Sequence, residues 1–145
     1  MYNQARITSS PEETFEFGSL LGNEIKPNTC VLISGDLGAG KTQLIKGLCA
    51  YYGIKPDQVQ SPTYSLHHSY TACTVLHHFD LYRMQSTQEF FDRGFMDILE
   101  TEDPIFIEWP SRIDPRVFKN KAVLEIDIQI VERTQRIIQI KHVAH

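Results

Sequence analysis

Eight consecutive residues carry the most specific chemistry in the sequence. Residues 35–42 are Gly-Asp-Leu-Gly-Ala-Gly-Lys-Thr and fit the pattern G-x-x-x-x-G-K-[ST], which cradles nucleotide phosphates. Its glycines let backbone N–H groups approach an anion without an intervening Cβ atom. The ammonium of Lys41 suits the β- and γ-phosphates, and the hydroxyl of Thr42 suits Mg²⁺. The residues predicted to contact a nucleotide are Gly35, Leu37, Gly38, Ala39, Gly40, Lys41, Thr42 and Gln43.

The segments on either side of this loop support the phosphate interpretation. Residues 30–34 form a short apolar run typical of a buried parallel strand, and residues 44–52 place apolar side chains at helical spacing. Gly53 is suited to end that helix. A helix that begins at the loop directs free N–H groups and its dipole toward an anion. The alternative, a glycine-rich turn with a chance Lys-Thr pair, does not account for both flanks.

Two acidic residues at the ends of other apolar segments are candidates for a metal and catalytic site. Residues 105–109 form a second apolar run, and Glu108 lies near its end, where a metal-bound or water-orienting acid belongs. Asp80 lies near the end of the strand predicted over residues 74–81. The alternative for Glu108 is a polar residue where a strand leaves the core, and for Asp80 a turn cap. The spacing leaves open which acid orients water and which holds metal.

Other polar residues are less specific. Thr63 follows Ser61-Pro62 and is a third catalytic candidate, a switch whose hydroxyl would touch Mg²⁺ or the γ-phosphate only in the triphosphate state. Ordinary loop chemistry explains this segment equally well. His67-His68 and His77-His78 could form a metal cluster, but strand alternation sends the members of each pair to opposite faces. They are interpreted as surface or packing residues.

The residues that would contact the nucleobase are harder to assign. Asn120-Lys121 lacks the Asp two residues later that guanine-specific sites carry, which favours adenine. Arg112 and Arg133 could stack on a base, and Arg83 could reach a phosphate or a partner, although surface charge also explains all three. Trp109 is interpreted as a core residue or a partner contact.

Length and composition are those of a small globular protein. The 145 residues suit a single domain over residues 1–145. The net charge of −4 disfavours a protein that binds nucleic acid through a positively charged surface of its own. The three cysteines are widely spaced and indicate neither a disulfide framework nor a zinc site. No signal-peptide pattern or membrane-spanning apolar run is present, so we expect a cytoplasmic protein.

The order of the segments predicts an α/β protein with a P-loop NTPase-like three-layer fold. Its mixed sheet is expected to have a parallel centre, formed by residues 30–34 and 105–109, and antiparallel hairpins, the last at a sheet edge. The predicted strands span residues 30–34, 64–70, 74–81, 105–109, 122–131 and 136–143. Helices are predicted after the N-cap Ser10, over 44–52 and over 86–100, the last broken at Gly94.

Four motifs in this order resemble one family. They are residues 35–42, Ser61-Pro62-Thr63-Tyr64, His78-Phe79-Asp80-Leu81-Tyr82-Arg83 and Ile107-Glu108-Trp109-Pro110. The chain resembles the TsaE family, the ATPase of the bacterial tRNA threonylcarbamoyladenosine (t6A) machinery. The phosphate loop is shared by very many proteins, whereas the Phe-Asp-Leu-Tyr-Arg and Glu-Trp-Pro motifs are far more specific. The resemblance covers essentially the whole chain.

The resemblance implies a cytoplasmic protein, away from membranes, that binds ATP or ADP with Mg²⁺ and hydrolyses ATP slowly alone. It implies TsaB and TsaD as partners, with tRNA reached only indirectly because TsaD carries the transfer to adenosine 37. Lys41 and Thr42 would be phosphate and metal residues and Glu108 a metal-site acid. Asp80 would be a catalytic-site acid and Thr63 a switch. Gln43 departs from the Thr or Ser common in the family, and its amide can still donate near the α-phosphate.

Two other functions fit the phosphate loop. A small P-loop phosphotransferase (kinase) has a similar size but needs an acceptor pocket and an arginine-bearing lid, and the arginines of this chain are scattered. A nucleotide-sensing module would bind ATP without turnover. Phosphorylated products in an acceptor screen would identify the first, and the absence of ADP in a single-turnover assay the second.

Overall fold

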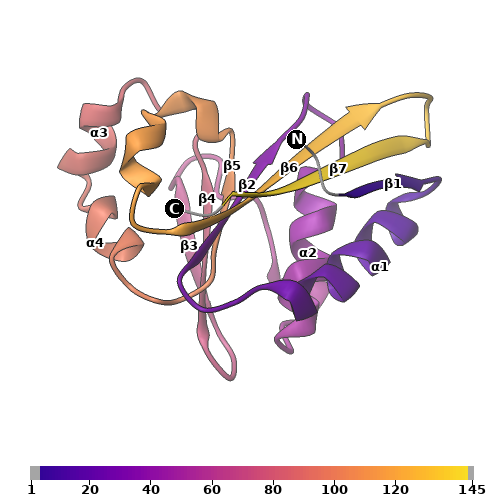
Figure 1. Ribbon diagram of the computed structural model, residues 1–145, viewed down its shortest axis with the longest axis horizontal. Helices are drawn as coiled ribbons and strands as arrows, with labels where there is room; N and C mark the ends of the chain where they lie inside the picture. Colours follow the sequence, from indigo (N-terminus) through magenta and orange to yellow (C-terminus); the bar gives the residue numbers. More distant parts are fainter. Residues whose placement is uncertain (1–3, 144–145) are drawn as a thin grey trace.

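The computed structural model describes residues 4–143, which form a seven-stranded mixed sheet with helices on both faces (Figure 1). The strands are β1 (Gln4–Thr8), β2 (Thr29–Ser34), β3 (His67–Thr71), β4 (Val75–Asp80), β5 (Ile105–Glu108), β6 (Ala122–Ile130) and β7 (Arg136–Val143). Their order is β1-β7-β6-β2-β5-β4-β3. β2 is parallel to β5 and β6, β4 is parallel to β5, and the β3–β4, β6–β7 and β1–β7 pairs are antiparallel. The predicted parallel centre and hairpins are confirmed.

Helices α1 and α2 cover one face of the sheet, and α3 and α4 lie on the other (Figure 1). The helices are α1 (Pro11–Leu21), α2 (Lys41–Tyr51), α3 (Thr87–Asp92) and α4 (Phe95–Leu99), with 3₁₀ turns η1 (Gly22–Glu24), η2 (Pro56–Gln58), η3 (Pro110–Arg112) and η4 (Pro115–Phe118). The hydroxyl of Ser10 accepts the Glu13 N–H at 3.1 Å and caps α1, as predicted. The predicted break at Gly94 is confirmed, since this residue has φ 78° and separates α3 from α4.

Alternation along the central strand builds a core on each side of the sheet. In β2, Val31 and Ile33 pack with α1 and α2, whereas Cys30 and Leu32 pack on the side of α3 and α4. All four side chains are buried, as expected of a parallel strand covered on both faces. The two layers of core fix β2, and with it the start of the loop that follows Ser34.

The structure corrects the predicted edge of the sheet. The sequence predicts the hairpin over residues 122–131 and 136–143 at an edge, whereas β6 lies beside β2 and β7 is covered by β1. Four of the five residues of β1 are exposed, and its apolar alternation is limited to Ala5 and Ile7, which is too short to predict a strand. The strand predicted over residues 64–70 begins at His67 because the preceding residues form a turn, in which Leu66 has φ 68°.

Two glycines let α1 and α2 pack closely. A Cβ atom at Gly47 would lie 2.1 Å from the Phe15 carbonyl oxygen and 2.9 Å from the Cα of Gly18. A Cβ atom at Gly18 would lie 2.4 Å from the Leu44 carbonyl oxygen. These approaches are shorter than van der Waals contact with backbone, so neither position has room for a side chain without moving a helix.

We expect Gly47→Ala to destabilise the protein, although alanine is normally the better helix former by about 1 kcal/mol. Overpacking a core typically costs about 1–3 kcal/mol, and here the new methyl group would meet backbone. Urea denaturation of wild type and variant measures the difference. Gly18→Ala should change stability in the same direction, and a stabilised Gly47→Ala protein would contradict the close packing.

Candidate functional site

The phosphate loop joins the end of β2 to the start of α2 and turns through left-handed backbone at two glycines. Gly38 has φ 81° and Gly40 has φ 107°. A Cβ atom at Gly38 would meet nothing within 4 Å, so backbone conformation, not space, favours glycine there. Gly35 lies against β6, because a Cβ atom at this position would lie 2.8 Å from the Ile128 carbonyl oxygen. The loop is thus held against the sheet at Gly35 and open at Gly38.

Lys41, the first residue of α2, has a buried ammonium with neutral partners. The residue is 5% exposed, and Nζ donates to the carbonyl oxygens of Gly35 and Asp36. Nζ also lies 4.3 Å from the ring centroid of Trp109. Burial lowers the pKa of Lys41, while the charges of Glu108, then Asp80, act in the opposite direction. Within residues 4–143 no carboxylate forms an ion pair with this ammonium, so a bound anion would supply the missing charge.

A cavity of about 510 Å³ opens beside this ammonium. Its walls come from the start of α1, the phosphate loop, the segment before β3 and the ends of β4 and β5. The lining residues are Pro11, Leu37, Gly38, Gly40, Lys41, Thr42, Gln43, Ser61, Thr63, Asp80, Tyr82, Glu108 and Trp109. The cavity therefore lies outside the carboxyl ends of parallel strands, where open α/β sheets bind ligands.

The two predicted acids meet in this cavity and share one hydroxyl group. Asp80 and Glu108 are the last residues of the neighbouring strands β4 and β5, face each other in register, and are 5% and 3% exposed. Ser61 Oγ lies 2.7 Å from Asp80 Oδ2 and 3.1 Å from Glu108 Oε2. A single hydroxyl hydrogen does not satisfy both carboxylates fully, so a cation placed beside them would relieve their repulsion.

A buried histidine forms a hydrogen bond with Glu108. His78 is fully buried, and its Nε2 lies 2.8 Å from Glu108 Oε2. Its Nδ1 lies 3.0 Å from the hydroxyl of Tyr70, whose pKa burial raises to about 12. With Nε2 protonated, His78 donates to Glu108 and accepts from the neutral Tyr70 hydroxyl. Both contacts of Glu108 use Oε2, which leaves Oε1 without a hydrogen-bond partner in the described part of the chain.

Asp80 is oriented differently from Glu108. Its Oδ1 accepts the Tyr82 N–H at 3.0 Å, and its Oδ2 accepts from Ser61. Both of its oxygens are therefore engaged by the protein. This difference favours Glu108 as the acid with an oxygen available to a metal or a water molecule.

The oxygen-rich cavity fits Mg²⁺. Thr42, Asp80 and Glu108 all line it, and hydroxyl and carboxylate oxygens are the ligands that Mg²⁺ prefers. No cluster of three or more His, Cys, Asp or Glu residues is arranged to hold a metal in residues 4–143. Mg²⁺ sites in nucleotide-binding proteins commonly combine one or two protein ligands with water and phosphate oxygens. Thr42 and Glu108 are the residues that would hold it.

Most of the residues predicted from the sequence lie together here. Thr63 lines the cavity, while Gly35 and Ala39 do not. The side chain of Ala39 is 1% exposed and belongs to the core under α1 and α2. Arg133 lines a second, neighbouring cavity of about 120 Å³, and Arg112 lies over the rings of Tyr82 and Trp109. The roles of all these residues remain predictions.

Sequence reasoning missed three residues of this site. Ser61 bridges the acids, although the prediction in this motif concerned Thr63. The sequence pattern favours a surface or packing role for His78, yet this residue precedes Asp80 by two positions and so points to the same face of β4. That alternation was a usable signal. Trp109, in left-handed backbone with φ 59°, lies over the Lys41 ammonium, and no local pattern indicates that contact.

His67 and His77 lie on the opposite face of the sheet from His78. His67 Nε2 lies 3.0 Å from His77 Nδ1, and His77 Nε2 lies 3.1 Å from Asp103 Oδ2. Burial and the neighbouring histidines lower the pKa of His67 to about 4, so its ring is neutral near pH 7. The predicted separation of His77 and His78 onto different faces is confirmed by the strand register.

The arrangement of sheet, loop and cavity is that of a P-loop NTPase fold. YdiB from Bacillus subtilis, a solved structure, has the same fold, with a TM-score of 0.73 and 24% identity over 99% of this chain and 88% of that chain. The chain belongs to the TsaE family: the family described as threonylcarbamoyl adenosine biosynthesis protein TsaE matches residues 8–138.

Two named relatives support this assignment. A protein from Rickettsia conorii named tRNA threonylcarbamoyladenosine biosynthesis protein TsaE is 33% identical over 91% of this chain and 74% of its own length. A Bacillus subtilis protein of the same name is 33% identical over 82% of this chain and 74% of its own length. In residues 4–143 no helix has the length and apolar character needed to cross a membrane.

Proposed function

We propose that this protein binds ATP with Mg²⁺, hydrolyses it slowly alone, and acts with TsaB and TsaD in the threonylcarbamoylation of tRNA adenosine 37. The observation that carries the proposal is the Lys41 ammonium, buried without an ion-pair partner in the described residues, beside a cavity that Thr42, Asp80 and Glu108 also line. Membership of the TsaE family supplies the pathway. ADP would occupy the same site, and a cytoplasmic location would follow from the tRNA substrate.

Each residue of the cavity would have a distinct task. The N–H groups of the loop and Lys41 would bind the phosphates, with Lys41 exchanging its carbonyl contacts for phosphate oxygens. Thr42 and Glu108 would hold Mg²⁺, which screens the negative charge that develops on the phosphates. The free Oε1 of Glu108 would orient the attacking water directly or through the metal shell. Asp80, fixed by Tyr82 and Ser61, would stabilise this arrangement, and Thr63 would contact the γ-phosphate as a switch.

The lining of the cavity supports slow hydrolysis by the isolated protein. Lys41 is the only cationic side chain among its described lining residues. An arginine that offsets charge in the transition state contributes about 10³–10⁵ in rate when a partner supplies it. A site without its own arginine would therefore turn over slowly until a partner completes it.

The same observation counts against the alternative of a small phosphotransferase. Such enzymes close an arginine-bearing lid over the phosphates, and the described cavity wall carries no arginine. Phosphorylated products from nucleosides or small alcohols would nevertheless support that alternative over the ATPase.

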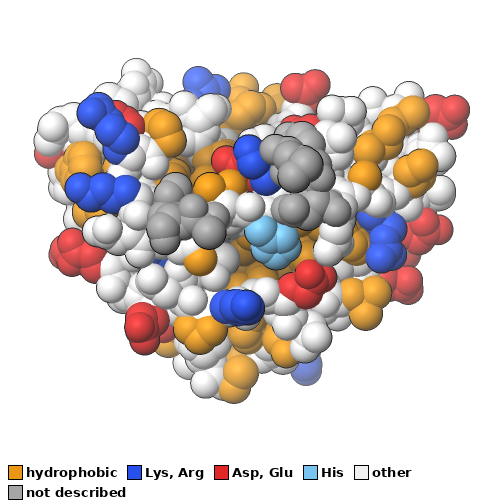
Figure 2. All heavy atoms as spheres, in the orientation of Figure 1, with side chains coloured by type: hydrophobic (Ala, Val, Ile, Leu, Met, Phe, Trp, Pro, Cys, Tyr) orange, Lys and Arg blue, Asp and Glu red, His pale blue; other side chains and the backbone are white. Residues whose placement is uncertain are grey.

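The charge distribution supports an indirect route to tRNA. The chain has a net charge of −4, and the face in Figure 2 mixes acidic, basic and hydrophobic side chains without one continuous basic patch. A protein that binds nucleic acid by its own field concentrates Lys and Arg on one surface. Contact with tRNA through TsaB and TsaD would not require such a surface.

The proposal is tested by measuring ATP turnover with and without a purified TsaB–TsaD pair, together with t6A formation on an unmodified tRNA in the presence of an activated threonylcarbamoyl donor. We expect weak turnover alone, a higher rate with the pair, and repeated rounds of t6A formation only when all three proteins and ATP are present. The partnership would be contradicted if the TsaB–TsaD pair left the rate of ATP turnover unchanged and the protein did not co-elute with the pair. ATP binding without any ADP product would favour a nucleotide-sensing module.

A further inference from the structure

The guanidinium of Arg136 joins the phosphate loop to the C-terminal hairpin. Arg136 is the first residue of β7, and its Nε donates to the Ala39 carbonyl oxygen at 3.0 Å across 97 positions of sequence. Its Nη2 donates to the Gly38 carbonyl oxygen at 3.2 Å. Nη1 donates to the carbonyl oxygens of Glu132 at 2.9 Å and Gln135 at 3.1 Å, in the turn between β6 and β7. One side chain therefore binds two loop carbonyls and the turn together.

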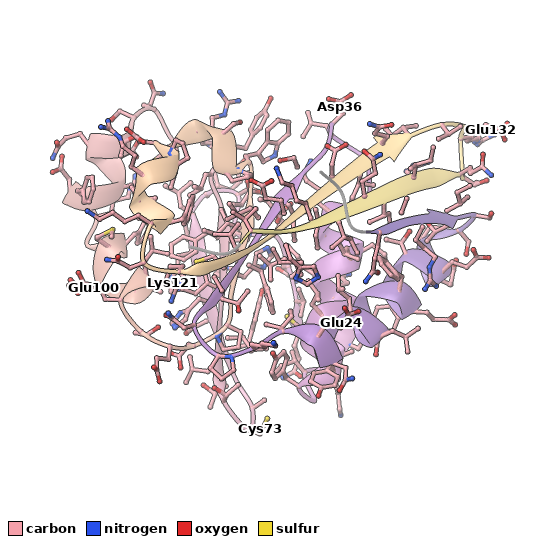
Figure 3. All side chains as sticks on the ribbon, viewed as in Figure 1. Glu24, Asp36, Cys73, Glu100, Lys121 and Glu132 are labelled. Atoms are coloured by element: carbon pink, nitrogen blue, oxygen red, sulfur yellow. The ribbon has the colours of Figure 1, made fainter. Side chains whose placement is uncertain are left out.

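Figure 3 shows the two segments along the same upper edge of the molecule, with Asp36 labelled in the loop and Glu132 in the turn. Arg136 is not among the residues that line the nucleotide cavity, and it lines a neighbouring cavity of about 120 Å³ that shares Gly38 and Gly40 with it. Its hydrogen bonds to the loop are with the carbonyl oxygens of Gly38 and Ala39. Any effect on nucleotide binding would be transmitted through the loop backbone.

Peptide geometry explains how such an effect arises. The C=O of one residue and the N–H of the next lie on opposite sides of the same planar unit. When Arg136 holds the Ala39 carbonyl oxygen on the outer side of the loop, it fixes the direction of the Gly40 N–H. Gly40 lines the nucleotide cavity, and its φ of 107° belongs to a backbone that glycine leaves free to rotate. An outer donor is therefore needed to hold this peptide in one orientation.

We propose that Arg136 is a positioning residue for the phosphate loop, which orients the peptide after Ala39 so that the Gly40 N–H faces the phosphates. The proposal deepens the proposed function and rests on it for the identity of the ligand. The planar fork of an arginine contacts two loop carbonyls and the turn at once, which the single ammonium of a lysine does not. Arg136→Lys keeps the positive charge but loses the planar fork, so it distinguishes positioning of the loop from simple attraction between a cation and the phosphates.

The test compares wild type, Arg136→Lys, Arg136→Ala and the control Lys141→Ala. Lys141 lies on the same strand, in register with Glu125 on β6, and its removal changes the net charge as Arg136→Ala does. Three quantities are measured: ATP affinity by calorimetry, kcat at saturating ATP, and amide hydrogen exchange of residues 38–41 by NMR in the nucleotide-free protein. Thermal unfolding confirms that each variant is folded.

We expect both Arg136 variants to weaken ATP binding, by about 10- to 100-fold for alanine, because two charge-assisted hydrogen bonds to the loop are lost. The value of kcat at saturating ATP should stay within about threefold of wild type, because no catalytic group is removed. Exchange at residues 38–41 should accelerate in both variants and not in Lys141→Ala. Should Arg136→Ala fail to fold, Arg136→Lys provides all three measurements.

Wild-type affinity in Arg136→Lys would overturn the proposal and assign the effect to charge alone. Unchanged amide exchange in both variants would overturn it as well. These outcomes are distinct from failure of the proposed function. In that case wild type itself would not bind ATP, while the exchange measurement on the nucleotide-free loop would still decide the role of Arg136.

Discussion

Replacing Lys41 with alanine is expected to reduce ATP affinity by roughly 100- to 1,000-fold, equivalent to about 3–4 kcal/mol. The side chain is buried at the first position of α2, and its ammonium contacts carbonyl oxygens and an indole ring, with no carboxylate paired to it in residues 4–143. Bound phosphates would replace these weak partners with full negative charges. Calorimetric titration with ATP measures the loss directly.

Lys46→Ala provides the matched control for Lys41. It removes the same charge from the same helix at a half-exposed position outside the cavity, so ATP affinity should stay close to wild type. Urea denaturation should show that Lys41→Ala remains folded, because no ion pair is broken and the Gly35 and Asp36 carbonyls are left to water. Equal losses of ATP affinity in both variants would place the phosphates elsewhere.

Glu108→Gln is expected to slow ATP hydrolysis by about 10²–10⁴ while ATP affinity changes little. Glutamine keeps the volume of the side chain and still accepts hydrogen bonds from His78 and Ser61 through its carbonyl oxygen. It lacks the negative charge needed to hold Mg²⁺ or to accept a proton from water. Single-turnover hydrolysis and calorimetry together separate the two effects.

Asp103→Asn is the control for Glu108→Gln. Asp103 pairs with His77 on one face of β4 much as Glu108 pairs with His78 on the other. The substitution removes a carboxylate from a histidine pair without touching the cavity, so hydrolysis should be retained. A loss of ATP affinity as large as the loss of hydrolysis in Glu108→Gln would show that the acid mainly supports binding.

The parts of the fold that depend on local patterns could be predicted from the sequence. The apolar run before the phosphate loop and the run ending at Glu108 were each long enough to identify a buried strand. Parallel strands end at a common edge, so an acid at the end of one strand is expected near a loop that follows another. This reasoning placed Asp80, Glu108 and Lys41 in one cavity.

What the sequence did not reveal depends on contacts between distant segments. β1 has a mostly exposed surface and becomes a strand only because β7 offers it an edge. Gly18 and Gly47 look like weak points in two helices until the helices are seen in contact. His78 could have been assigned from alternation, whereas the Arg136 contact with Ala39 spans 97 positions and follows no local pattern.

The place of β2 in the sheet also bears on synthesis of the protein. The two strands beside β2 are β5 and β6, and both come later in the chain. Arg136, which binds the loop, also comes later. At about 5–20 residues per second, the ribosome needs roughly 5–20 s to add the intervening 97 residues. The glycine-rich segment therefore emerges well before the residues that support it, and a nascent chain would acquire its affinity for nucleotide only after β5, β6 and Arg136 have been made.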